Sequence, residues 1–220
     1  MNTDNYGVYG SETVLYGGTV PVWKHIDNDG TEEAGGKFKV VASFATEYPA
    51  GTIIPVGTPV NLSAPGGDLT ILKTYEVAAT WDASDTTISF KALGVALPLV
   101  AGVVLMKAPA TTATTGAAYT VPADIALNVS TGFYDLSIVA NAWGTATAGD
   151  IFVEADSAGG SGKVIKTIPT GLLRREVRIN AGATTATGAS VFHGEIRVDR
   201  IPPIPACVKT VLPMIKFTGE

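Results

Sequence analysis

Few residues in this chain have the type and spacing that covalent catalysis requires. The sequence holds two histidines, His25 and His193, and a single cysteine, Cys207. A catalytic serine, threonine or cysteine needs a neighbouring base that activates it. His193 lies in a strand-like segment, and no polarising residue stands near Cys207 in the sequence. We therefore expect no catalytic residues, and we predict that the protein is not an enzyme.

One glycine-rich segment, Ser157–Lys163 (SAGGSGK), has the ending of a phosphate-binding loop. That motif needs glycine where Ser157 stands and serine or threonine where Val164 stands. It also needs a following helix whose N-terminal amides hold the phosphate. The residues that follow, Val164–Ile168, have the pattern of a strand instead, so we expect no nucleotide site.

Two acidic groups have some features of a calcium site. Asp150, Glu154 and Asp156 would share one face of a strand, and Asp27–Gly30 begins like a calcium-binding loop. Calcium takes six or more oxygen ligands, and the twelfth position of that loop is Phe38. We expect no metal site and no cofactor.

Three aromatic residues leave two interpretations open. Trp81, Trp143 and Tyr134 could stack on sugar rings, which would make the chain a carbohydrate- or surface-binding module. The same side chains could instead fill cores and the bases of loops, which is the interpretation we favour.

Composition argues against several classes of partner. The 220 residues have a net charge of -5, and 16% of them are charged, against about 25% in an average soluble domain. Basic residues are outnumbered, so we expect no nucleic acid partner. The densest basic cluster, Arg174, Arg175 and Arg178, is interpreted as a solvated strand edge.

The apolar segments and the single cysteine bear on location. The longest apolar run, residues 92–106, contains two glycines and a proline and is shorter than the roughly 18–20 residues that span a bilayer, so we expect no membrane partner. One cysteine cannot form an internal disulfide, and no secretion leader is visible. We expect the chain to be made in a reducing compartment.

The spacing of β-forming residues and turn residues predicts an all-β fold. Strands are expected within 37–44, 70–77, 86–91, 102–107, 126–129, 133–139, 150–154, 164–168, 176–179, 190–198 and 214–217. The 102–107 strand is mostly apolar, so we expect it to be buried on both sides. One helix is predicted over 206–212, because Pro205 suits a first helical position and Pro213 would stop the helix.

Shifts in composition predict three parts. Residues 1–36 form an N-terminal arm, 37–109 a first, decoration-like β domain and 110–220 a second β domain. The boundary falls in the Ala/Thr-rich segment Ala108–Ala118. We expect two small β modules of barrel, tulip or sandwich type, with an extended arm and at most one short helix near the C-terminus.

The arm places aromatic residues among glycines. Tyr6, Tyr9, Tyr16 and Trp23 are spaced without a clear period, which does not make a self-contained core. Either the arm packs on a partner, with these four residues as contacts, or it folds onto its own domain.

Four segments, in order, resemble a family of bacteriophage proteins. Tyr48–Val60 is similar to a segment of tailed-phage capsid decoration domains. The chain also resembles head fiber proteins of phages and prophages from Bacteroides-type bacteria, within Gly102–Pro109, Gly149–Ala155 and His193–Phe217. The resemblance runs from about Lys37 to the C-terminus and is weakest in the arm.

The resemblance implies a non-enzymatic virion protein, assembled in the cytoplasm of a bacterial host. Such a protein would sit outside the phage head, bind the major capsid protein and form a homo-oligomer, a trimer. Tyr6, Tyr9, Tyr16 and Trp23 are then the candidate capsid-binding residues. The longest head fibers extend into coiled coil, but this chain has no heptad run, so we expect a compact decoration and not a shaft.

Overall fold

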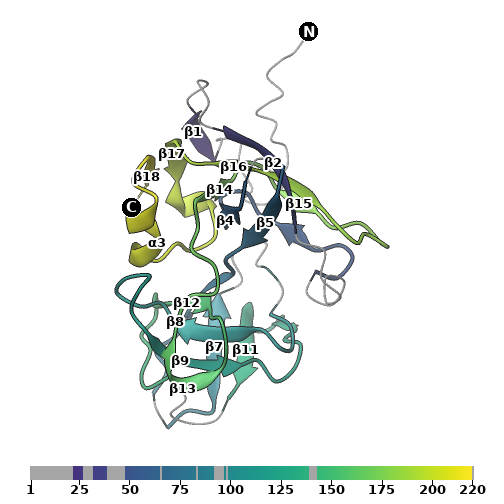
Figure 1. Cartoon of the computed structure of the whole chain (residues 1–220). Helices are drawn as coiled ribbons and strands as arrows, with labels where there is room; N and C mark the ends of the chain where they lie inside the picture. Colours follow the sequence, from purple (N-terminus) through teal and green to yellow (C-terminus); the bar gives the residue numbers. More distant parts are fainter. Residues whose placement is uncertain are drawn as a thin grey trace. The chain divides into compact units, whose positions relative to one another are not determined.

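The chain folds almost entirely as β-strands (Figure 1), as the sequence predicts. The computed structural model describes residues 22–26, 32–38, 48–64, 66–82, 84–91, 97, 99–138 and 143–219. Within these ranges the one α-helix is α3 (Ala206–Val211), which confirms the helix predicted near the C-terminus. A 3₁₀ turn, η2 (Val198–Arg200), precedes it.

The chain forms two compact units that interleave along the sequence. Unit 1 comprises Met1–Ile71, Pro169–Pro202 and Leu212–Glu220, and unit 2 comprises Leu72–Ile168 and Pro203–Val211. Unit 2 is therefore inserted into the sequence of unit 1. Two of the crossings lie at prolines, a residue type common at domain boundaries.

Unit 1 is built around five strands whose pairings close into a barrel. Their order is β14 (Gly171–Leu173), β16 (Thr187–Val191), β2 (Glu32–Phe38), β5 (Asp68–Ile71) and β4 (Pro59–Leu62). All pairs are antiparallel except β2 with β5. Alternating apolar residues of these strands are buried, including Val60, Leu62, Leu69 and Ile71.

Two smaller β elements complete unit 1. A three-stranded sheet has the order β1 (Trp23–Ile26), β17 (Gly194–Arg197) and β18 (Ile215–Thr218), with β17 antiparallel to β1 and parallel to β18. A separate pair joins β3 (Ile53–Ile54) to β15 (Val177–Arg178).

Unit 2 contains two sheets. The first has the order β13 (Gly159–Lys163), β9 (Gly116–Thr120), β8 (Val104–Lys107), β12 (Ile151–Glu154) and β6 (Thr74–Glu76). The second has the order β10 (Leu127–Asn128), β11 (Phe133–Ser137) and β7 (Thr87–Lys91). A bridge between Val77 and Phe90 connects the two sheets where β6 ends.

The core of unit 2 is aromatic and fully enclosed. Phe90 and Phe152 meet edge to face, with ring centroids 5.5 Å apart, and Tyr75 packs on Phe90 at 5.9 Å. Leu105 and Met106 of β8 are both buried, although consecutive strand residues point to opposite faces. This confirms the expectation that the 102–107 strand is covered on both sides.

The two units differ from the predicted domains in their boundaries. The Ala/Thr-rich segment near residue 109 was the predicted boundary, but it lies inside unit 2 and contributes β9. Ile71 and Leu72, which end unit 1 and begin unit 2, lie within the single strand predicted over 70–77. Two strands, β5 and β6, occupy that region, because Leu72 and Lys73 separate them.

The predicted arm also differs from the structure where the structure describes it. β1 pairs with β17, and β2 is part of the barrel, where it pairs with β16 and β5. Residues 22–26 and 32–36 therefore belong to the β-structure of unit 1. This is the second of the two interpretations, an arm that folds onto its own domain, and it applies to these residues only.

Candidate interaction surfaces

Of the residues considered for catalysis, His25 lies on β1 opposite Glu195 of β17, two residues after His193, and Cys207 lies in α3. No group of three or more His, Cys, Asp or Glu side chains is arranged to hold a metal ion among the described residues. Cys207 is buried in α3, and burial raises the pKa of its thiol, so the thiol stays protonated at neutral pH. No helix in the described ranges is long and apolar enough to cross a membrane.

The residues considered as ligands have partners within the protein. Asp150 pairs with Lys107 at 2.8 Å, and Glu154 pairs with Lys166 at 2.6 Å. The Val164 N–H donates to Asp156 Oδ1 at 3.2 Å. Residues Gly159–Lys163 of the glycine-rich segment form β13, and Lys163 Nζ donates to Ser157 Oγ.

The aromatic residues considered for sugar stacking belong to the core of unit 2. Trp81 is 1% exposed, and Trp143 and Tyr134 are partly buried against the same core. Trp143 Nε1 donates to the Leu105 carbonyl, and its ring meets Phe152 edge to face at 4.9 Å. Their faces are therefore used for packing, which confirms the favoured interpretation of these side chains.

Trp23 is the one candidate capsid contact within the described residues, because Tyr6, Tyr9 and Tyr16 lie outside them. Trp23 is 9% exposed, and its Nε1 donates to the carbonyl of Arg174 at 3.1 Å. A Cβ on Gly194 would lie 3.3 Å from the Trp23 ring, so the glycine lets the ring lie close against β17. Trp23 thus packs within unit 1 and holds β1 onto it, and its role as a capsid contact stays a prediction.

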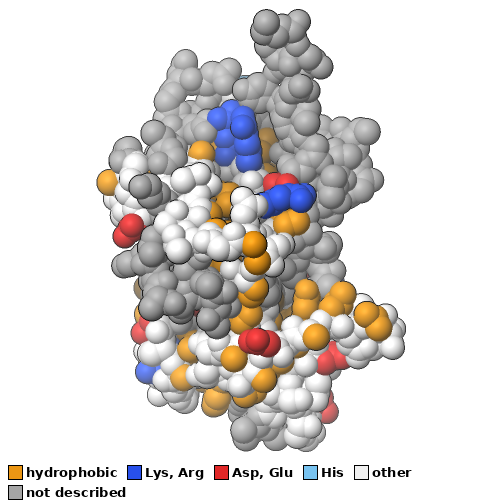
Figure 2. Space-filling model, turned by 90° about the vertical axis from the view of Figure 1, so that its right-hand side faces the viewer, with side chains coloured by type: hydrophobic (Ala, Val, Ile, Leu, Met, Phe, Trp, Pro, Cys, Tyr) orange, Lys and Arg blue, Asp and Glu red, His pale blue; other side chains and the backbone are white. Residues whose placement is uncertain are grey.

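A hairpin in unit 2 exposes apolar side chains. It consists of β10, the turn 129–132 and β11, and we call it the apolar hairpin. Val129, at the start of the turn, is 90% exposed, and Leu127 is 44% exposed. β10 lies at the edge of its sheet in the described strand order. Figure 2 shows how hydrophobic side chains are spread over one face of the molecule, with few charged ones between them.

Hydrogen bonds hold the tip of the apolar hairpin in one conformation. The Asn128 carbonyl accepts from the Gly132 N–H at 2.7 Å, and Asn128 Oδ1 accepts from the Ser130 N–H at 3.0 Å. Asn128 Nδ2 donates to Asp135 Oδ2 at 2.8 Å, and Ser89 Oγ donates to Asp135 Oδ1 at 2.5 Å. This network crosses all three strands of the sheet.

The ordered tip is a suitable surface for binding a protein. A Val side chain exposed to water gives no stability to the fold, whereas covering it in a complex stabilises that complex by about 1.5 kcal/mol or more. Because the turn is already fixed, binding would cost little conformational entropy. The sequence signals the turn through Asn128-Val129-Ser130 and Thr131-Gly132, but it does not reveal how far Val129 projects.

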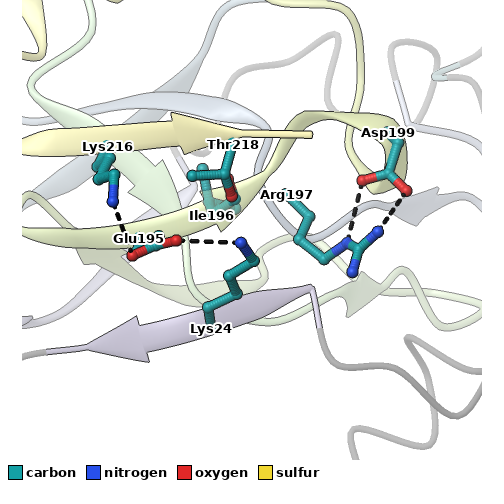
Figure 3. A network of polar contacts seen from close by, with 7 residues as sticks. All are labelled: Lys24, Glu195, Ile196, Arg197, Asp199, Lys216 and Thr218. Atoms are coloured by element: carbon teal, nitrogen blue, oxygen red, sulfur yellow. Dashed lines mark hydrogen bonds and ion pairs between the residues drawn. The ribbon is translucent and has the colours of Figure 1, made fainter. Parts of the chain in front are cut away.

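A second surface lies on the β1–β17–β18 sheet of unit 1 (Figure 3). Glu195 on β17 lies between two lysines: Lys24 Nζ is 3.1 Å from Oε1, and Lys216 Nζ is 3.5 Å from Oε2. Two residues along β17, Arg197 donates Nε and Nη2 to the two oxygens of Asp199, both at 3.1 Å.

Arg200 completes this second group, with its Nε 3.8 Å from Asp199 Oδ2. We call the six residues the basic sheet face: Lys24, Glu195, Arg197, Asp199, Arg200 and Lys216. The hydrogen bond from Lys24 lowers the pKa of Glu195, and the hydrogen bonds from Arg197 lower the pKa of Asp199. Both carboxylates therefore stay ionised at neutral pH.

Comparisons with family models, with curated proteins and with solved structures find no match to this chain.

Proposed function

We propose that this chain is a non-enzymatic structural protein of a bacteriophage particle that binds the outside of the phage head. In this role it acts as a decoration or head fiber protein, and its partner is the major capsid protein. The particle would be assembled in the cytoplasm of a bacterial host.

The apolar hairpin is the observation that carries this proposal. A protein that works by assembly needs an ordered surface with apolar side chains that a partner can cover. Val129 and Leu127 provide such side chains, on a turn held by the hydrogen bonds of Asn128. A stable contact would cover on the order of 1,000 Å² or more, so the hairpin would form its centre and neighbouring residues its rim.

The segments that resemble phage proteins support the specific partner. They contribute ordered elements in the described structure: β3 in Tyr48–Val60, β8 in Gly102–Pro109, β12 in Gly149–Ala155, and β17 to β18 in His193–Phe217. The resemblance thus involves the framework of both units and not a single loop.

A variant of the hairpin tests the proposal. Val129→Asp would place a charge where a partner must exclude water, and we expect it to reduce association with purified heads by about tenfold or more. Since Val129 is 90% exposed, the substitution should leave the fold intact. Co-sedimentation of the purified protein with heads that lack it measures the association.

A matched control is Val129→Thr, which keeps the shape of the side chain and adds no charge. We expect it to retain most of the binding. If Val129→Asp binds heads as well as the unchanged protein does, the hairpin is not the contact. If the unchanged protein does not bind heads, the proposed function is wrong.

A further inference from the structure

The basic sheet face differs in charge from the chain as a whole. Among its six described residues, Lys24, Arg197, Arg200 and Lys216 are cations and Glu195 and Asp199 are carboxylates, so these six side chains together carry a charge of +2. The whole chain has a net charge of -5. Within this group each carboxylate is shared by two cations.

The cations are held in place by residues of the fold. Glu195 joins β1 to β17 to β18 through its two lysines, and Arg197 is fixed by two hydrogen bonds to Asp199 (Figure 3). Lys24 and Lys216 remain partly exposed, with 43% and 72% of their side-chain surface accessible. A ligand would therefore meet positive charge whose positions are already set.

The edge strand β18 favours an extended ligand. β18 lies at the edge of its sheet in the described strand order, and Lys216 projects from it. An edge strand can pair with an extended segment of another chain through backbone hydrogen bonds. Carboxylates on alternate residues of that segment would then face one side of the sheet.

We propose that the basic sheet face binds an extended acidic polypeptide segment of the protein to which this chain attaches. The inference rests on the proposed function, and it specifies that the segment of the partner bound here is acidic and extended. Charge complementarity between the carboxylates of the segment and the four cations supplies the selectivity, and pairing at β18 fixes the direction of the segment.

A labelled Glu-Gly repeat peptide is the probe for this surface, and a Gln-Gly repeat is its neutral counterpart. We expect fluorescence anisotropy to show binding of the acidic peptide at low salt, weaker binding at high salt and no binding of the neutral peptide. The double variant Lys24→Gln, Lys216→Gln brings the net charge of the face to zero. It should bind the acidic peptide about tenfold more weakly.

The matched control is Lys107→Gln with Lys163→Gln, which removes two cations from unit 2. It should bind the acidic peptide as the unchanged protein does. Equal binding by both double variants, or no binding by the unchanged protein, would overturn the inference. Tighter binding of single-stranded DNA, with the same loss in Lys24→Gln, Lys216→Gln, would reassign the face to nucleic acid and overturn it as well.

Association with heads separates this inference from the proposed function. If heads bind the unchanged protein and bind the Lys24→Gln, Lys216→Gln variant equally well, only the inference about the acidic segment is wrong. If heads bind the unchanged protein but not the variant, the result supports both the proposed function and the inference about the acidic segment. If heads bind neither protein, the proposed function is wrong, and the peptide measurement still decides whether the face binds acidic polypeptide.

Discussion

At the scale of single residues, glycines show where the chain is packed most tightly. Gly171 lies in β14, between β4 and β16 of the barrel. A Cβ at this position would lie 2.2 Å from Ser190 Oγ and 2.6 Å from the Val191 carbonyl oxygen. The barrel can close here only because residue 171 has no side chain.

Gly171→Ala should therefore destabilise the protein. The added methyl group must displace backbone as well as a side chain, and we expect the free energy of unfolding to fall by about 1–3 kcal/mol. Gly160→Ala is the control, because nothing the structure describes lies within 4 Å of a Cβ there. Urea unfolding followed by circular dichroism measures both variants, and equal stabilities would contradict this account of the barrel.

At the scale of elements, the apolar hairpin depends on one carboxylate. Asp135 accepts from Ser89 Oγ on β7 and from Asn128 Nδ2 on β10, so it joins three strands. Asp135→Ala would remove both bonds and leave the turn less restricted. We expect a loss of about 1–2 kcal/mol in stability.

Asp135→Ala should also loosen the turn of the apolar hairpin, in addition to lowering the stability of the whole protein. Hydrogen exchange of the backbone amides in 128–133 should become faster in Asp135→Ala than in the unchanged protein, while amides of the unit 1 barrel should change less. Unchanged exchange in the turn would show that Asp135 does not order it.

The basic sheet face makes stability depend on acidity. The pKa values of Glu195 and Asp199 lie below their ordinary values of 4.5 and 3.8, because Lys24 and Arg197 donate to the ionised carboxylates. The two ionised carboxylates give their full contribution to stability when the pH lies above the ordinary pKa values. This contribution is lost as the pH falls through the lowered pKa values. Asp199 is exposed and Glu195 is partly exposed, so solvent screens both carboxylates and the contribution is small.

The double variant Glu195→Gln, Asp199→Asn isolates this contribution. The difference in melting temperature between it and the unchanged protein should be constant between about pH 5 and 8, and it should shrink below about pH 4. A difference that grows on acidification would contradict the lowered pKa values.

Much of the element pattern follows from local sequence. Residues 86–91 were predicted as a strand and form β7, and Pro205 and Pro213 bracket α3. Residues 164–168 were predicted as a strand but form only one bridge, from Ile165 to Ala155. The neighbouring glycines form β13 instead, because pairing with β9 outweighs the low strand propensity of glycine.

The two surfaces were harder to predict, because each is assembled from distant residues. Glu195 meets a lysine 171 residues earlier in the chain and another 21 residues later. An arm that folds onto its own domain was one of the two interpretations, but an aromatic residue among glycines does not reveal that Trp23 will pack on Gly194. Spacing along the chain carries little information on such contacts.

At the scale of the whole molecule, we propose a β protein that works by association with other chains. A low content of charged residues and exposed apolar side chains such as Val129 favour assembly with other chains. We expect the purified protein to form a homotrimer, with a mass three times 22.6 kDa. Light scattering coupled to size-exclusion chromatography measures this mass, and a monomer at every concentration tested would contradict the expectation.

The central claim is that the protein belongs to the outside of a phage head. Its copy number in particles purified from a strain that carries the gene tests this most directly, by quantitative mass spectrometry against the major capsid protein. We predict a fixed ratio, either near one copy per capsid subunit or one trimer per capsomer. Absence of the protein from purified particles would contradict the account.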